Sequence, residues 1–198
     1  MSKAAKYMHE VGMLNRTPRS GFIFLGSGKQ SVSEHSFRML HLAFYLARVS
    51  PEPVDELQLL HLVMFHDLPE ARTSDLNYEN QKYVKVDDEK VWRDLGNELP
   101  NGAEIVGYIR EFEARESPAA RLANDADQLE LLLVLKEQRE LGNPRADDWV
   151  PPLLARLKTT VGKQLAEEIL ATRSDEWWFG DRNDEYWIHR GREKNERE

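Results

Sequence analysis

A histidine and an aspartate stand side by side at His66 and Asp67, directly after the apolar run "VDELQLLHLVMF". A charged group buried without a partner costs several kcal/mol, so this carboxylate needs a cation or a hydrogen-bond donor. Two further acids, Glu70 and Asp75, follow in the stretch "FHDLPEARTSD". Imidazole and carboxylate groups hold divalent metals and transfer protons in hydrolytic enzymes. The stretch therefore indicates a metal site, although a core histidine bonded to an acid would explain His66 alone.

Other parts of the chain offer partners of the same types. His35 follows Glu34, and "NDADQLELLL" places Asp125 and Asp127 before a run that must be buried. Attraction to a helix dipole could explain an aspartate at a helix start, but Ser117 already caps this helix. One metal bound by His35, by the His66–Asp67 pair and by one of the two later aspartates would give each of these four residues a partner. The remaining histidines are interpreted as packed or surface residues: His9, His41, His61 and His189.

Composition limits the class of protein. The chain has 198 residues, a formal net charge of −8 and no cysteine. Disulfides, thiolate catalysis and cysteine-held metals are thereby excluded, and the negative charge argues against a nucleic-acid polymer as partner. We find neither an apolar run near the roughly 18 residues of a membrane span nor the pattern of a signal peptide. We therefore expect a cytoplasmic protein without membrane contact.

Helical periodicity dominates the sequence, so we predict an all-α fold, a single-domain helical bundle with the metal site in its core. Pro69 should end one helix and begin the next, leaving Asp67 at the junction. Residues 1–179 should form the domain, and the charged tail 180–198 should be partly mobile. The predicted helices span residues 3–13, 53–67, 77–99, 103–115, 117–142 and 151–173. A further helix should begin at a Ser33 cap and stop by Pro51, and the segment 151–173 should be one helix or a kinked pair.

Four motifs in order, "NRTP", "SEH", "HDLPEARTSD" and "ADQL", span residue 14 to about residue 131. As a set they resemble the HD-domain metal-dependent phosphohydrolases, and within them the 5′-deoxynucleotidase family. The resemblance implies an HD-domain bundle that holds one divalent ion, such as cobalt or manganese. It assigns the ligands to His35, His66, Asp67 and Asp127. Asp125, about 200° from Asp127 around a helix, is then a solvated or capping residue.

The resemblance also assigns roles to the residues around the metal. It implies that Glu70 transfers a proton, that Asp75 positions substrate and water, and that Arg16 binds the phosphate with its planar, charged fork. Thr17 stands where the family has an aromatic residue that excludes the ribose 2′-hydroxyl, and Ser74 replaces a glycine. A second cation, Arg19, could imply a different phosphate pocket.

The predicted function is metal-dependent release of phosphate from (deoxy)ribonucleoside 5′-monophosphates by a 5′-nucleotidase. A nucleoside triphosphate hydrolase, or a hydrolase of another small phosphate ester, is the alternative on the same fold. A non-catalytic nucleotide-binding regulatory module is the alternative from a different class. The resemblance further implies a homodimer, for which the amphipathic stretches 104–115 and 152–170 offer contact surfaces unless they cover the core of the same chain.

Overall fold

The computed structural model describes residues 2–189, and it confirms the all-α prediction. Within this range the only β pairing is a single bridge between Pro18 and Ser31. No helix among these residues is long and apolar enough to cross a membrane. The helices are α1 (Lys3–Val11), η1 (Gly12–Asn15), α2 (Phe22–Leu25), α3 (Val32–Val49), α4 (Glu56–Phe65), α5 (Glu70–Thr73), η2 (Asn80–Lys82), α6 (Asp88–Glu98), α7 (Gly102–Ala114), α8 (Pro118–Glu140), α9 (Ala146–Arg156), α10 (Thr160–Ala171), α11 (Glu176–Phe179) and α12 (Glu185–His189).

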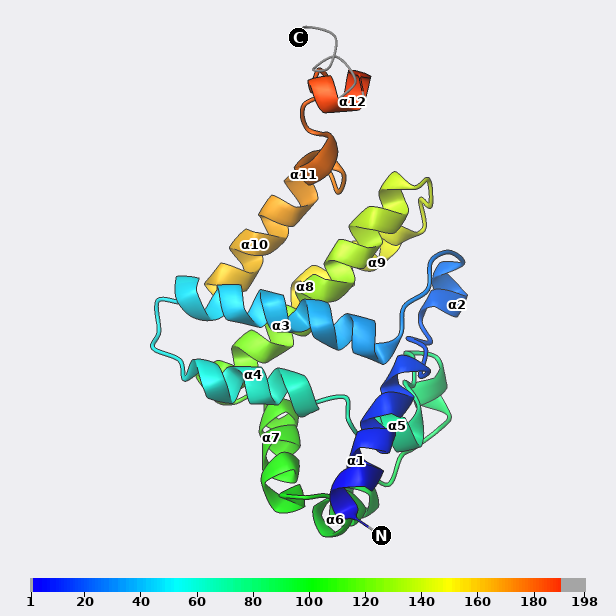
Figure 1. Ribbon diagram of the computed structural model, residues 1–198, viewed down its shortest axis with the longest axis vertical. Coiled ribbons are helices and arrows are strands. Elements are labelled where there is room, and N and C mark those ends of the chain that lie inside the picture. Colours follow the sequence, from blue (N-terminus) through cyan, green and yellow to red (C-terminus); the bar gives the residue numbers. More distant parts are fainter. Residues whose placement is uncertain (1, 190–198) are drawn as a thin grey trace, which may run out of the picture.

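Helix α8 is the central element of the bundle, and it contacts α3, α4, α7, α9 and α10. Its start follows from the sequence: the Ser117 hydroxyl accepts a hydrogen bond from the Ala120 N–H, and Pro118 occupies the first turn. Figure 1 shows α3 and α4 lying across α8, so that residues far apart in the sequence meet in the middle of the molecule. The predicted helix 117–142 is confirmed.

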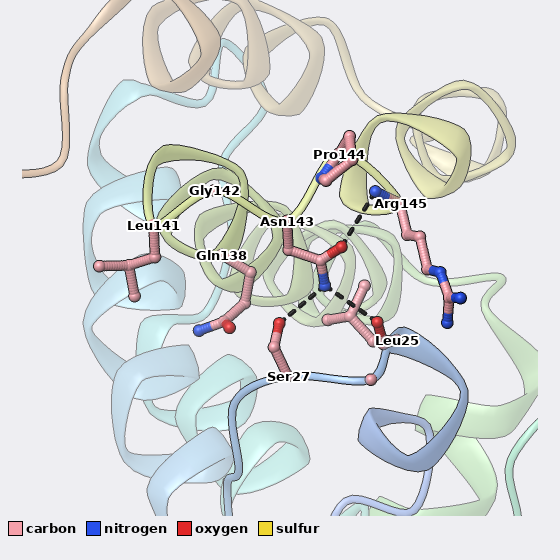
Figure 2. A pocket seen from close by; sticks show the side chains of 9 residues that line it. Leu25, Ser27, Gln138, Leu141, Gly142, Asn143, Pro144 and Arg145 are labelled. Atoms are coloured by element: carbon pink, nitrogen blue, oxygen red, sulfur yellow. Dashed lines mark hydrogen bonds between the residues drawn. The ribbon is translucent and has the colours of Figure 1, made fainter.

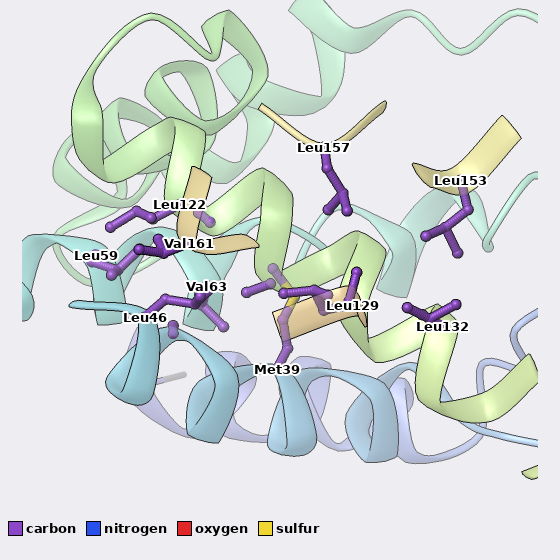
Figure 3. Close-up of a cluster of buried hydrophobic side chains, with 14 of the residues drawn as sticks. Met39, Leu46, Leu59, Val63, Leu122, Leu129, Leu132, Leu153, Leu157 and Val161 are labelled. Atoms are coloured by element: carbon purple, nitrogen blue, oxygen red, sulfur yellow. The ribbon is translucent and has the colours of Figure 1, made fainter. Parts of the chain in front are cut away.

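Large hydrophobic side chains from several helices form the main core (Figure 3). Met39 and Leu46 of α3 and Leu59 of α4 are fully buried beside Leu129 and Leu132 of α8. Each such side chain contributes about 1.5–3 kcal/mol when it leaves water. A second cluster, made of Leu14, Val32, Leu68, Leu95, Leu99, Ile105 and Ile109, packs where η1, α6 and α7 meet. Metal ligands placed between the two clusters would rest on rigid elements.

Some predicted boundaries are wrong. Ser31, not Ser33, caps α3, in a capping box whose Ser31 hydroxyl and Glu34 carboxylate satisfy each other's backbone N–H groups. The predicted helix 77–99 is helical only from Asp88 onward apart from one short turn, because the Asn77 side chain accepts from the Glu79 and Asn80 N–H groups and favours a turn.

The kinked-pair alternative is right for the last predicted helix. It is two helices, α9 and α10, and α9 begins before the predicted start and carries Pro151 and Pro152 inside it. The break between them is held by Asp125, which is fully buried and accepts hydrogen bonds from the Lys158 and Thr159 N–H groups. The solvated reading of Asp125 is therefore wrong: this aspartate holds the start of α10.

The C-terminal end lies away from the main core. Helices α11 and α12 continue beyond α10 at one end of the molecule (Figure 1) and carry exposed aromatic residues such as Trp177 and Tyr186. The proposed domain boundary at residue 180 stays a prediction, and residues 190–198 lie outside the described part of the chain.

Candidate metal centre

Three helices bring the predicted ligands together. His35 comes from α3, His66 and Asp67 follow the end of α4, and Asp127 comes from α8. His35 Nε2 lies 3.3 Å from Asp127 Oδ1 and 3.7 Å from Asp67 Oδ2, and His66 Nε2 lies 3.1 Å from Asp67 Oδ2. One ligand atom from each of His35, His66 and Asp127 lies within 4.8 Å of the others, a spacing that one metal ion could bridge.

Three of the atoms that face this point make no hydrogen bond within the described part of the chain. His35 Nε2, His66 Nε2 and Asp67 Oδ2 are buried, and none makes a hydrogen bond to a described residue. Most buried polar atoms in proteins are hydrogen-bonded, so a cluster of exceptions calls for an explanation. Two imidazole nitrogens and a carboxylate oxygen are typical ligands of a divalent transition metal. The donor set therefore fits such an ion.

Both imidazole rings are held by their other nitrogen. His66 Nδ1 lies 2.7 Å from the Val63 carbonyl oxygen, to which it donates, and this leaves Nε2 free of a proton in the neutral ring. His35 Nδ1 lies 2.6 Å from Glu130 Oε2. The sequence analysis missed Glu130, although an acid within the buried run "LELLL" needs a partner.

Glu70 and Asp75 form a second group of acids beside the ligands. Burial, together with the charges of Asp67 and Asp75, raises the pKa of Glu70 to about 9, so this carboxyl group is protonated at neutral pH. Burial also raises the pKa of Asp75, and the Ser20 hydroxyl lies 3.4 Å from its Oδ1. Helix α4 ends at Phe65, before the predicted end at residue 67, whereas Pro69 directly precedes α5 as predicted and places Glu70 in the first turn of that short helix.

The arginine among these acids is Arg19. Its guanidinium lies 3.5 Å from Asp67, 3.4 Å from Asp75 and 3.9 Å from Asp127. Arg16, to which the resemblance assigns the phosphate, is exposed. Thr17 is buried, and its hydroxyl donates to the Met13 carbonyl oxygen. The cation next to the candidate ligands is thus the second arginine of "RTPRSGF".

The backbone before Asp75 is strained. Ser74 has φ 62° and ψ 161°, a conformation that is essentially restricted to glycine. We expect Ser74→Gly to raise the free energy of unfolding by about 1–2 kcal/mol, because relief of strain outweighs the added freedom of the unfolded chain. Urea denaturation measures this change. Ser74→Ala, which keeps the Cβ, is the matched control; an equal gain in both variants would contradict the strain.

The ionisation of the cluster predicts a pH dependence of the metal-free protein. Burial and Arg19 favour the neutral His35 ring, but the nearby carboxylates of Asp127 and Glu130 outweigh them and raise its pKa to about 9. The folded-state pKa is above the unfolded value near 6.5, so the resulting stabilisation is complete below pH 6.5 and is lost as pH rises through 9. The raised pKa of Glu70 acts in the same direction.

We therefore expect the chelator-treated protein to lose about 3 kcal/mol of unfolding free energy from His35 alone between pH 6.5 and 9, and more when Glu70 is included. Urea denaturation in the presence of EDTA measures the loss. Added divalent metal should offset it, because the ion binds only the folded, neutral imidazoles. Stability that stays flat or rises over this pH range would contradict these ionisation states.

A surface hollow of about 430 Å³ lies elsewhere, between the end of α8 and the loop after α2 (Figure 2). The Asn143 amide closes one side by donating to the Leu25 carbonyl oxygen and the Ser27 hydroxyl. Among the described residues, no acidic residue or histidine lines this hollow. It lacks the groups that hydrolysis requires, so we place the chemistry at the buried cluster.

Comparison with known proteins finds a matching family and similar chains. The sequence model of the HD domain family matches residues 11–170. A 5′-deoxynucleotidase HDDC2 from Danio rerio is 29% identical over 153 residues, which cover 73% of this chain and 74% of that protein. That relative is named for an activity on deoxynucleotides.

Two solved structures share the fold. A conserved hypothetical protein from Pyrococcus furiosus superposes with a TM-score of 0.74 at 22% identity, covering 85% of this chain and 100% of the other. A predicted metal-dependent phosphohydrolase from Magnetospirillum magnetotacticum MS-1 superposes with a TM-score of 0.67 at 24% identity, covering 84% and 91%. At these identities the likeness concerns the fold alone.

Proposed function

The chain belongs to the HD domain family, and from this premise we propose that it is a metal-dependent 5′-nucleotidase that releases phosphate from (deoxy)ribonucleoside 5′-monophosphates. One observation carries the proposal: the Nε2 atoms of His35 and His66 and the Oδ2 atom of Asp67 are buried, near one another, and without hydrogen-bond partners in the described chain. The name of the Danio rerio relative supports the choice of substrate class.

In this proposal His35, His66, Asp67 and Asp127 hold one divalent ion, with cobalt or manganese as the first candidates. When bound, such an ion supplies Lewis-acid chemistry for the hydrolysis of a phosphate ester. His66 is held by the Val63 carbonyl and His35 by Glu130, so both rings present Nε2 without rearrangement. The low pKa of Asp127, about 2, keeps this ligand ionised at neutral pH, because His35 and Arg19 outweigh the effect of burial.

The other groups bind the substrate and move a proton. Glu70, protonated at neutral pH, can donate to the leaving 5′-oxygen of the nucleoside. Arg19 supplies a fork of N–H donors for the phosphate oxygens, and we propose it for the role that the resemblance gives to Arg16. Asp75, beside both Arg19 and Ser20, positions the substrate and the attacking water.

Selection between ribose and deoxyribose should be weak. Thr17 occupies the position of the family's aromatic residue, and its hydroxyl is engaged by the Met13 carbonyl oxygen. A buried threonine held in this way offers no aromatic face against the ribose. We therefore propose that both sugar types are accepted.

A panel of nucleoside mono- and triphosphates, assayed with manganese or cobalt, tests the function. The proposal expects orthophosphate from 5′-monophosphates and little product from triphosphates. Release of inorganic triphosphate from a nucleoside triphosphate would favour the alternative hydrolase on the same fold. The absence of any phosphate release from monophosphates, with metal bound, would favour the non-catalytic binding module.

We further propose a homodimer that works in the cytoplasm. The stretches 104–115 and 152–170 place most of their apolar residues in the two cores and offer little for a partner. The outer face of α3 instead exposes Phe37, Phe44 and Tyr45, at the spacing of one helix face. Light scattering of the purified protein, with Phe44→Glu as the disrupting variant, measures the oligomeric state.

A further inference from the structure

Glu130 is a buried carboxylate that no motif of the sequence assigns to a function. It lies on α8 one turn after Asp127, and its side chain is 1% exposed. Its Oε2 atom lies 2.6 Å from Nδ1 of His35, which is itself fully buried. A buried acid needs strong partners, and here one partner is a candidate metal ligand.

The other carboxylate oxygen of Glu130 fixes the side chain. Oε1 accepts a hydrogen bond of 2.6 Å from Gln30 Nε2 and one of 3.0 Å from Arg38 Nε. Arg38 also pairs with Glu137, at 2.5 Å through Nη1. Glu130 is therefore held from one side by two donors and directs its second oxygen at the imidazole of His35.

We propose that Glu130 is a positioning residue of the metal centre: by accepting a hydrogen bond from Nδ1–H of His35, it orients the ring and leaves Nε2 to bind the ion. The inference rests on the metal centre proposed above and deepens it. A neutral imidazole carries one proton, and the hydrogen bond made by one nitrogen decides which nitrogen can ligate. Carboxylate partners of this kind also make the imidazole a better ligand.

The two histidine ligands differ in a way that makes the inference testable. His66 donates to a backbone carbonyl, that of Val63, which no side-chain substitution removes. The Nδ1 atom of His35 is instead held by one side chain, that of Glu130. Substitution of Glu130 should therefore impair one ligand of the ion and leave the other in place.

The test is a titration of the metal-free, full-length protein with Co²⁺, followed by visible absorption. Glu130→Gln keeps one acceptor oxygen, which His35 and Arg38 must then share, so we expect about a 10-fold weaker Co²⁺ affinity. Glu130→Leu removes the acceptor, and we expect a loss nearer 100-fold. The matched control is Glu137→Gln, which alters the other partner of Arg38 and should leave the affinity within about twofold.

A second readout separates positioning from a purely structural role. In the proton NMR spectrum of the Co²⁺-loaded protein, the exchangeable Nδ1 protons of His35 and His66 should each give a signal that is strongly shifted by the paramagnetic ion. Glu130→Leu should lose the signal of His35 by exchange with water and keep that of His66. Unfolding curves of the metal-free variants establish that each is folded. If Glu130→Leu does not fold, the comparison of Glu130→Gln with the wild type is the test.

Distinct outcomes separate this inference from the proposed function. If the wild type binds Co²⁺ and the Glu130 variants bind it equally well, or if Glu137→Gln weakens binding as much as Glu130→Gln, the positioning role is wrong while the metal centre stands. If the folded wild type binds no Co²⁺, both are wrong. Graded loss from wild type through glutamine to leucine, with Glu137→Gln unaffected, supports the inference.

Discussion

Asp127→Asn is expected to lower kcat/KM for a nucleoside 5′-monophosphate by about 10³-fold and to abolish stoichiometric metal binding. The Asp127 carboxylate lies 3.3 Å from His35 Nε2, and its ionised form is strongly favoured. An amide removes the negative charge that a divalent ion requires from this ligand. Steady-state kinetics and the metal content of the dialysed protein measure the two effects.

Asp125→Asn is the matched control, two positions earlier on the same helix. The Asp125 carboxylate accepts from the backbone of Lys158 and Thr159, and an added Cβ on Gly162 would collide with it. An amide placed against these donors should lower the free energy of unfolding by about 2–4 kcal/mol. Metal binding by the folded protein should persist. If Asp125→Asn abolishes metal binding and Asp127→Asn does not, the assignment of the two aspartates is reversed.

Arg19→Ala is expected to lower kcat/KM by about 10²-fold, whereas Arg16→Ala should change it by less than about threefold. The guanidinium of Arg19 lies among Asp67, Asp75 and Asp127, while Arg16 is exposed. Arginine is suited to a phosphate because it presents several N–H donors in one plane. The pair of variants therefore compares two arginines three positions apart under the same assay.

A third variant refines this comparison. Arg19→Lys keeps the positive charge but loses the planar fork, so we expect it to recover only part of the lost activity. Each variant should retain its metal, because Arg19 is not a ligand. A large defect in Arg16→Ala together with a normal Arg19→Ala would restore the assignment that the sequence resemblance implies.

The residues proposed as metal ligands could be selected from the sequence because the motifs fix both residue type and order. The structure brings His35, His66 and Asp127 within bridging distance of one another and places Asp67 beside the two histidines. The start of α8 could also be predicted, because Ser117 and Pro118 are residues that favour the beginning of a helix.

Other features depend on tertiary contacts that local sequence does not encode. Arg16 and Arg19 occur in the same loop, and only the folded chain shows which of them reaches the acids. Asp125 looks solvated in sequence because its partners lie beyond residue 150. Glu130 lies within an apolar run of the sequence, and its contacts with Gln30 and His35 join residues that are 100 and 95 positions apart in the chain.

The central claim is that one metal ion at this cluster supports phosphomonoester hydrolysis. Titration of the metal-free protein with Co²⁺, with orthophosphate release from a deoxyribonucleoside 5′-monophosphate followed at each step, tests it most directly. We expect no activity without metal and a linear rise in activity that ends at one Co²⁺ per chain. Activity that is independent of metal, a rise that ends only at two ions per chain, or no phosphate release from the loaded protein would contradict it.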